Sequence, residues 1–307
     1  MFTSIRTRLA SIIEEYDKYG EYRINALKGT YAFFMLSLVY MIYDVPHPYF
    51  NFFYLPLTAL TAEMAGETVK SKYWLFFHAT MGSIIAVFLF NILAPYPIFF
   101  AFFVFLYSLL HYIIALHYIK NIFLPIPIVL SLAIYSLAYG EIYTDAYMAF
   151  NNALVSLVAM IIIIGALVLF PCYYYLKAWR RAYILLLKQI LNNFVITKNN
   201  QPNQSIATGA IQGHMIKVVK YSRLLSHRFP IFSILKTNFL VNDLRVLSCV
   251  IDQDVIKATP QELDSLINNL HLLIVAIVKK SPCMVSNEKN GTLQKMIHSW
   301  NYLCSQI

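Results

Sequence analysis

Five ionisable residues fall inside or beside long apolar stretches of this sequence. They are Glu63, Glu67, His78, His111 and His117. Ionisable groups within a membrane are costly and usually functional, and carboxyl and imidazole groups removed from water can exchange protons near neutral pH. These residues are therefore candidates for a proton-accepting or gating site. The alternative is that the two acids only pair with Lys70 or Lys72, while each histidine bonds to a neighbouring backbone carbonyl.

Basic residues mark the ends of the same apolar stretches. The set comprises Arg23, Lys28, Lys70, Lys72, Lys120, Lys177, Arg180 and Arg181. A ring of such cations would raise the local concentration of an organic anion. The alternative is that they follow the positive-inside rule and bind anionic lipid headgroups.

The composition requires a membrane to position these residues. Hydrophobic residues make up 59% of the chain, charged residues make up 13%, and the mean hydropathy is +0.59. Soluble domains are only about 45–50% apolar. The charge is also uneven, since residues 1–176 carry 8 Lys/Arg against 9 Asp/Glu, whereas residues 177–307 carry 16 against 6. This asymmetry predicts two domains in different environments.

Six apolar stretches have lengths close to the roughly 20 residues that cross a bilayer as a helix. They cover residues 26–43, 49–65, 73–93, 96–118, 122–139 and 146–170. Strands are excluded because unpaired strand edges cannot be satisfied in lipid. The loops at 44–48, 94–97 and 140–145 contain no Lys or Arg. The positive-inside rule therefore predicts that both termini face the cytoplasm. The expected location is the inner (plasma) membrane.

The predicted fold class is an all-α membrane protein, with six transmembrane helices followed by a cytoplasmic helical domain. Residues 1–25 are expected to form a cytoplasmic amphipathic helix, 26–172 the transmembrane domain, and 173–307 a basic helical domain. Helices in the last domain are expected near 174–197, 206–228, 231–251, 261–280 and 291–305. Thr259, Pro260 and Glu262 form a capping-box pattern that predicts a helix start.

Several short motifs carry a resemblance to a known family. They are Arg23 with Lys28, the Pro48-Tyr49-Phe50 step, the turn at 66–70, the Ala79-Thr80-Met81-Gly82 stretch and the Leu169-Phe170-Pro171 exit. In these features the chain resembles the fusaric acid resistance protein-like group of aromatic acid exporters. It departs from that pattern in having Phe76 or Phe77 where the family has Arg. The resemblance implies transport of organic anions and assembly of two subunits.

The motifs of common enzymes are missing from the sequence, which contains no P-loop, no dinucleotide-binding fingerprint and no zinc-protease motif. We expect no enzymatic activity, no cofactor, no metal site and no nucleic-acid partner, and four free cysteine thiols. The expected partners are the bilayer, its anionic lipids, a second copy of the chain and a small organic anion. The predicted function is export of organic acids, aromatic ones among them, driven by an ion gradient. An anion channel and a non-transporting scaffold that anchors the basic domain are the alternatives.

Overall fold

The structure is a computed structural model. It describes residues 13, 15–43, 49–64, 66, 68–119, 146–171, 173–199, 208–225, 229–252, 259–284 and 291–306. All regular elements among these residues are helices, which confirms the all-helical class for the described part of the chain. The chain divides into two compact units, here called the apolar unit (Arg23–Pro171) and the basic unit (Met1–Tyr22 with Cys172–Ile307).

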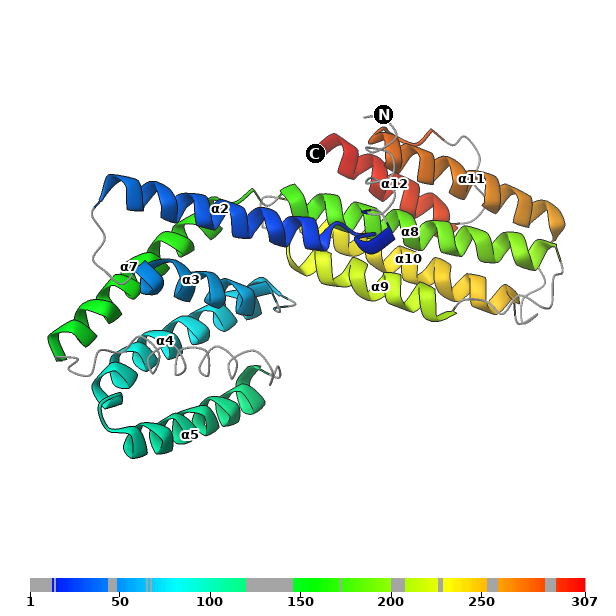
Figure 1. The fold of residues 1–307 in the computed structure, drawn as a ribbon. Coiled ribbons are helices and arrows are strands. Elements are labelled where there is room, and N and C mark those ends of the chain that lie inside the picture. Colours follow the sequence, from blue (N-terminus) through cyan, green and yellow to red (C-terminus); the bar gives the residue numbers. More distant parts are fainter. Residues whose placement is uncertain are drawn as a thin grey trace, which may run out of the picture. The chain divides into compact units, whose positions relative to one another are not determined.

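The apolar unit is built around three mutually packed helices. Its elements are α2 (Glu21–Ile42, whose first two residues belong to the basic unit), α3 (Tyr49–Met64), α4 (Val69–Leu93), α5 (Pro97–Ile114), the π-helix η1 (Ala115–Ile119) and α7 (Ala146–Leu169). Helices α3, α4 and α7 pack against one another, and α5 packs on α4 (Figure 1). Leu36, Phe52, Phe90 and Ile163 are buried in the common core.

Within the described ranges of the apolar unit, three helices are long and apolar enough to cross a membrane. They are Val69–Leu93, Pro97–His117 and Ala146–Leu169, with 25, 21 and 24 residues. Their outward faces are also apolar, as shown by exposed Phe102 and Phe105 on α5 and Ile161 on α7. A helix that is hydrophobic on all sides is suited to lipid and not to water. A membrane location is therefore plausible on length and composition.

The other three predicted spans are not among these helices. Helix α2 carries Glu21, Arg23 and Lys28 in its first turns, and α3 has only 16 residues, with Pro56 inside it. The predicted span over 122–139 lies outside the described residues.

Two helix starts differ from the sequence prediction. Helix α4 begins at Val69 and not at Tyr73, because Thr68 caps it: the Thr68 hydroxyl accepts from the Ser71 amide (3.1 Å), and the Ser71 hydroxyl accepts from the Thr68 amide (3.0 Å). The single amphipathic helix predicted over 1–25 is wrong in its final part. The chain turns at 18–20, where Gly20 has a φ of 83°, and α2 starts afresh at Glu21.

In its described residues the basic unit is a bundle of five helices together with the end of the N-terminal segment. The helices are α8 (Tyr173–Lys198), α9 (Thr208–Arg223), α10 (Ile231–Asp252), α11 (Pro260–Lys279) and α12 (Gly291–Gln306). Helix α8 packs against α9, α10 and α11, and α12 packs against α10 and α11 (Figure 1). All five overlap the predicted ranges. Trp179, at the centre, is buried and donates from Nε1 to Asn238 Oδ1 (3.1 Å).

The predicted capping box at the start of α11 is confirmed. The Thr259 hydroxyl accepts from the Glu262 amide (3.3 Å), while the Glu262 carboxylate accepts from the Thr259 amide (2.9 Å). Pro260 occupies the first helical turn. Two amides that the helix itself cannot satisfy thus gain partners.

Replacing Thr259 by alanine should lower the free energy of unfolding by about 1 kcal/mol, because the first turn of α11 loses its side-chain cap. Denaturant titration followed by circular dichroism measures this change. Gln261→Ala, an exposed neighbour in the same turn, should stay within about 0.5 kcal/mol of the parent. Equal stability of Thr259→Ala and the parent would contradict the assignment.

Candidate functional site

Two of the predicted histidines meet between α4 and α5 in the apolar unit. His111 Nδ1 lies 3.1 Å from His78 Nε2, and the ring centroids are 5.0 Å apart. His111 is buried and His78 is half-buried. A hydrogen bond between two imidazole nitrogens needs one donor and one unprotonated acceptor. The pair can therefore hold one excess proton while this bond persists, but not two.

Tyr107 and Gly82 hold the His111 ring in place. Tyr107, one turn before His111, packs edge-on against it with a centroid distance of 4.5 Å, and its hydroxyl donates to the Gly82 carbonyl (2.7 Å). A Cβ atom on Gly82 would lie only 2.6 Å from His111 Cε1. The imidazole can approach α4 this closely only because position 82 has no side chain.

The spacing along α5 explains why these groups share one face. Phe100, Phe103, Tyr107 and His111 recur at three- and four-residue intervals, which place side chains on one side of a helix. The rings of the first three lie within 6.1 Å of the Phe90 ring on α4, measured between centroids. This aromatic packing fixes the register in which His111 faces His78.

Further polar groups lie along α4 in the same unit. The Thr80 hydroxyl donates to the Phe76 carbonyl (2.7 Å) and lies 3.6 Å from Met160 Sδ on α7. The Ser83 hydroxyl is buried and has no hydrogen-bond partner among the described residues. Asn91 is also buried. Helix α4 thus carries a series of polar side chains into an otherwise apolar core.

Of the three remaining ionisable candidates, only His117 has a side chain within the described part of the structure. His117 lies on η1 and is exposed. Glu63 belongs to the last turn of α3, but its side chain lies outside the described part of the structure, as does Glu67. Within the described residues, no group of three His, Cys, Asp or Glu side chains could hold a metal ion. Two imidazoles joined by a hydrogen bond can bind a proton.

The predicted basic ring is divided between the two units. Arg23, Lys28, Lys70 and Lys72 belong to the apolar unit, Lys177, Arg180 and Arg181 belong to the basic unit, and Lys120 lies outside the described residues. Lys28 and Lys72 are buried, with 5% and 6% of their surfaces exposed. Lys28 Nζ lies 5.7 Å from the centre of the Phe170 ring. Two of the four predicted cations in the apolar unit thus have buried side chains. The ring as a whole stays a prediction.

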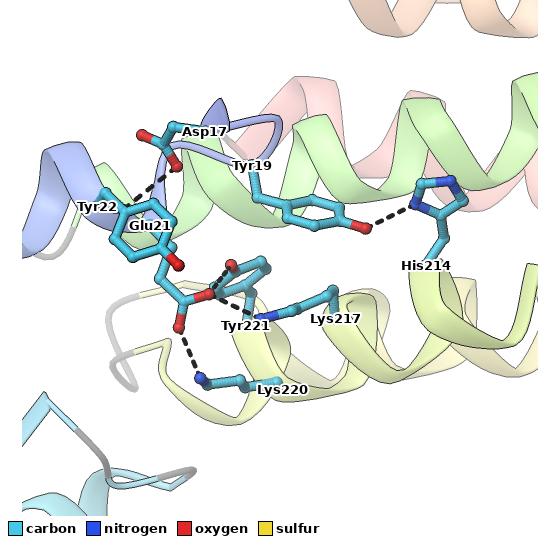
Figure 2. Close-up of polar contacts among 8 residues, drawn as sticks. All are labelled: Asp17, Tyr19, Glu21, Tyr22, His214, Lys217, Lys220 and Tyr221. Atoms are coloured by element: carbon cyan, nitrogen blue, oxygen red, sulfur yellow. Dashed lines mark hydrogen bonds and ion pairs between the residues drawn. The ribbon is translucent and has the colours of Figure 1, made fainter. Parts of the chain in front are cut away.

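A second polar cluster joins the N-terminal segment to α9 within the basic unit. The Glu21 carboxylate accepts from Lys217 Nζ (2.8 Å), Lys220 Nζ (2.6 Å) and the Tyr221 hydroxyl (2.9 Å). Figure 2 shows the three donors converging on this one side chain. This cluster was not predicted, although the spacing of residues 217, 220 and 221 already places three donors on one helix face.

The Glu21 cluster is held in its charged form. Burial alone would raise the pKa of Glu21, but the hydrogen bonds from Lys217, Lys220 and Tyr221 outweigh burial and lower this pKa to about 2. Beside it, the Tyr19 hydroxyl lies 2.8 Å from His214 Nδ1. Burial, and then the nearby Lys18, lower the pKa of His214, so its ring is neutral near pH 7 and its Nδ1 can accept from Tyr19.

Comparison of the chain with protein families, with curated proteins and with solved structures finds no match. Function is therefore inferred from the residues themselves.

Proposed function

We propose that this protein is a multi-pass membrane transporter that exports organic anions in exchange for, or together with, protons. The observation that carries the proposal is the hydrogen-bonded pair of His78 and His111 between two helices long and apolar enough to cross a membrane. The proposal includes six spans, namely the three helices named above together with 26–43, 49–65 and 122–139. Both termini would then face the cytoplasm of an inner-membrane protein.

The pair suits proton coupling because both members are imidazoles, which bind protons reversibly, and both are at least partly removed from bulk water. Imidazole changes charge between about pH 5 and 8. Binding one proton turns the pair from a neutral unit into a cation, while the Nδ1 to Nε2 bond can persist. A second proton would remove the acceptor and separate the rings. Protonation can thus change both the charge and the α4 to α5 contact, which are the two requirements of a gate.

An organic anion is the proposed substrate class. The resemblance to the fusaric acid resistance-like group favours it, and so do the buried cations Lys28 and Lys72 in the apolar unit. We extend the proposal to a pair of chains, because one six-helix unit leaves little room for a path. If the protein is instead a non-transporting scaffold, vesicles that contain it should show no flux of the anion.

Replacing either histidine by glutamine should remove the pH dependence of transport, because the amide keeps polarity but cannot bind a proton in this range. The test is efflux of an aromatic dicarboxylate such as phthalate from vesicles containing the purified protein, measured between about pH 5 and 8. His271→Gln, an exposed histidine of α11, is the matched control and should keep the parent profile. Parent protein that gives no more flux than empty vesicles would contradict transport. A parent-like pH profile in both His78→Gln and His111→Gln would remove the pair from the mechanism.

A further inference from the structure

The basic unit contains a partly enclosed cavity of about 250 Å³. It lies between the first two turns of α8, the end of α11 and the face of α12. Its principal lining residues are Tyr173, Lys177, Trp179, Arg180, Lys280 and Trp300. This volume fits a small ligand or a headgroup and not a large substrate.

Three cations converge on this cavity, and none of them has an acidic partner among the described residues. Lys177 Nζ lies 4.7 Å from the centre of the Tyr173 ring, and Lys280 Nζ lies 3.1 Å from the hydroxyl of the same tyrosine. Arg180 Nε is buried and has no hydrogen-bond partner among the described residues. None of the lining residues that the structure describes is Asp or Glu. Like charges held together repel, and a buried unpaired donor is costly, so an anion in the cavity would relieve both penalties.

Another part of the cavity lining is apolar and includes Trp179 and Trp300. Trp179 and Trp300 are almost fully buried, with 1% and 4% of their surfaces exposed. Their indole N–H groups are already used, by Asn238 Oδ1 (3.1 Å) and by the Ser281 carbonyl (3.0 Å). The indoles therefore offer the cavity ring surface and no free donor. A ligand that fits this lining therefore has both an anionic group, for the cations, and an apolar body, for the indole rings.

We propose that this cavity binds a phosphate group attached to a small apolar or aromatic body. Phosphate is favoured over a single carboxylate because three cations converge, and a phosphate monoester can carry up to two negative charges and several acceptor oxygens. Arginine supplies a planar fork of donors to such oxygens, and each lysine supplies a point charge. Two sources share this chemistry, namely the headgroup of an anionic phospholipid and a soluble phosphate ester. The inference does not depend on the transport proposal.

The test uses the full-length protein carrying Trp74→Phe, so that Trp179 and Trp300 are the remaining tryptophans. In the first arm, phenyl phosphate is titrated into the protein in phosphatidylcholine nanodiscs while tryptophan fluorescence is recorded, with phenol as the uncharged control. In the second arm, nanodiscs containing phosphatidic acid replace the neutral ones, and native mass spectrometry detects lipid retained by the protein. Saturation in the first arm identifies a soluble ester, and retention only in the second identifies a lipid.

Two variants and one matched control distinguish a specific binding site from nonspecific electrostatic attraction. Arg180→Gln removes the guanidinium, and Lys280→Gly removes the ammonium while suiting the left-handed φ of 57° at that position. Each should weaken binding on the order of tenfold or more, as for one lost charge-assisted contact. Arg181→Gln removes the same charge from the next, exposed residue of α8 and should leave binding unchanged. Equal weakening by all three variants, or the lack of binding in both arms, would overturn the proposal.

Discussion

Replacing Gly82 by alanine should break the contact between His78 and His111 and lower pH-dependent transport on the order of tenfold or more, since ångström-scale displacements in a site have effects of that size. The added Cβ would lie 2.6 Å from His111 Cε1, closer than packed atoms approach. The added atom therefore displaces the imidazole. The ring cannot make a small shift towards Tyr107, because the Tyr107 ring centroid already lies 4.5 Å from its own. Imidazole nitrogen NMR shifts report the broken bond, and vesicle flux reports its effect on transport.

Gly165 provides the matched control for this substitution. It also lies within a predicted span, on α7, but a Cβ atom added there meets no other atom within 4 Å. Gly165→Ala should therefore keep transport and stability, or gain stability slightly through higher helix propensity. If Gly82→Ala and Gly165→Ala give the same pH-dependent flux, the close approach of His111 to α4 is not needed for transport.

Replacing Glu21 by glutamine should lower the free energy of unfolding of the basic unit by about 1–3 kcal/mol. The carboxylate accepts from two lysines and one tyrosine, and an amide carries no charge to neutralise Lys217 and Lys220. A quarter of the Glu21 side chain is exposed, so water screens part of its interaction with the lysines. The loss of unfolding free energy is therefore smaller than the lowering of the Glu21 pKa alone would give. Glu15→Gln, an exposed acid in the same segment, should leave stability unchanged.

The same cluster predicts an acid-dependent loss of stability. The pKa of Glu21 is about 2 in the folded protein, lowered from an ordinary value of 4.5. Its contribution is therefore complete above about pH 4.5 and is lost as the pH falls from there towards 2. Denaturant titrations across this range should show a smaller decline in Glu21→Gln than in the parent. Parallel declines in the two proteins would contradict the role of this carboxylate.

Local patterns in the sequence predicted local structure well. The capping box at Thr259 requires only residues three apart, and the helices of the basic unit follow from apolar periodicity over one or two dozen residues. The start of α4 was missed because Ser71 takes the place of the usual Glu or Gln in its capping box. The break before α2 was missed because the predicted helix was extended past Tyr16, where the apolar spacing ends, and across Gly20, whose backbone is left-handed.

Contacts between segments far apart in the chain could not be predicted from the sequence. His78 and His111 were each recognised as candidates, but their meeting depends on the register of α4 against α5, which Phe90 and Gly82 set. Tyr107 was missed, although its position one turn from His111 marks it as a neighbour. Glu21 lies 196 residues from Lys217, so their pairing depends on the packing of the N-terminal segment on α9.

The most direct test of proton-coupled export is the movement of protons that the substrate itself drives. Vesicles containing the purified protein and an internal pH-sensitive dye are loaded with phthalate, whose two charges slow its passage through bare lipid, and are then diluted without a pH gradient. The account predicts a change of internal pH with the parent protein and none with a variant carrying both His78→Gln and His111→Gln. Phthalate efflux without any change of internal pH, or a double variant that moves protons as the parent does, would contradict it.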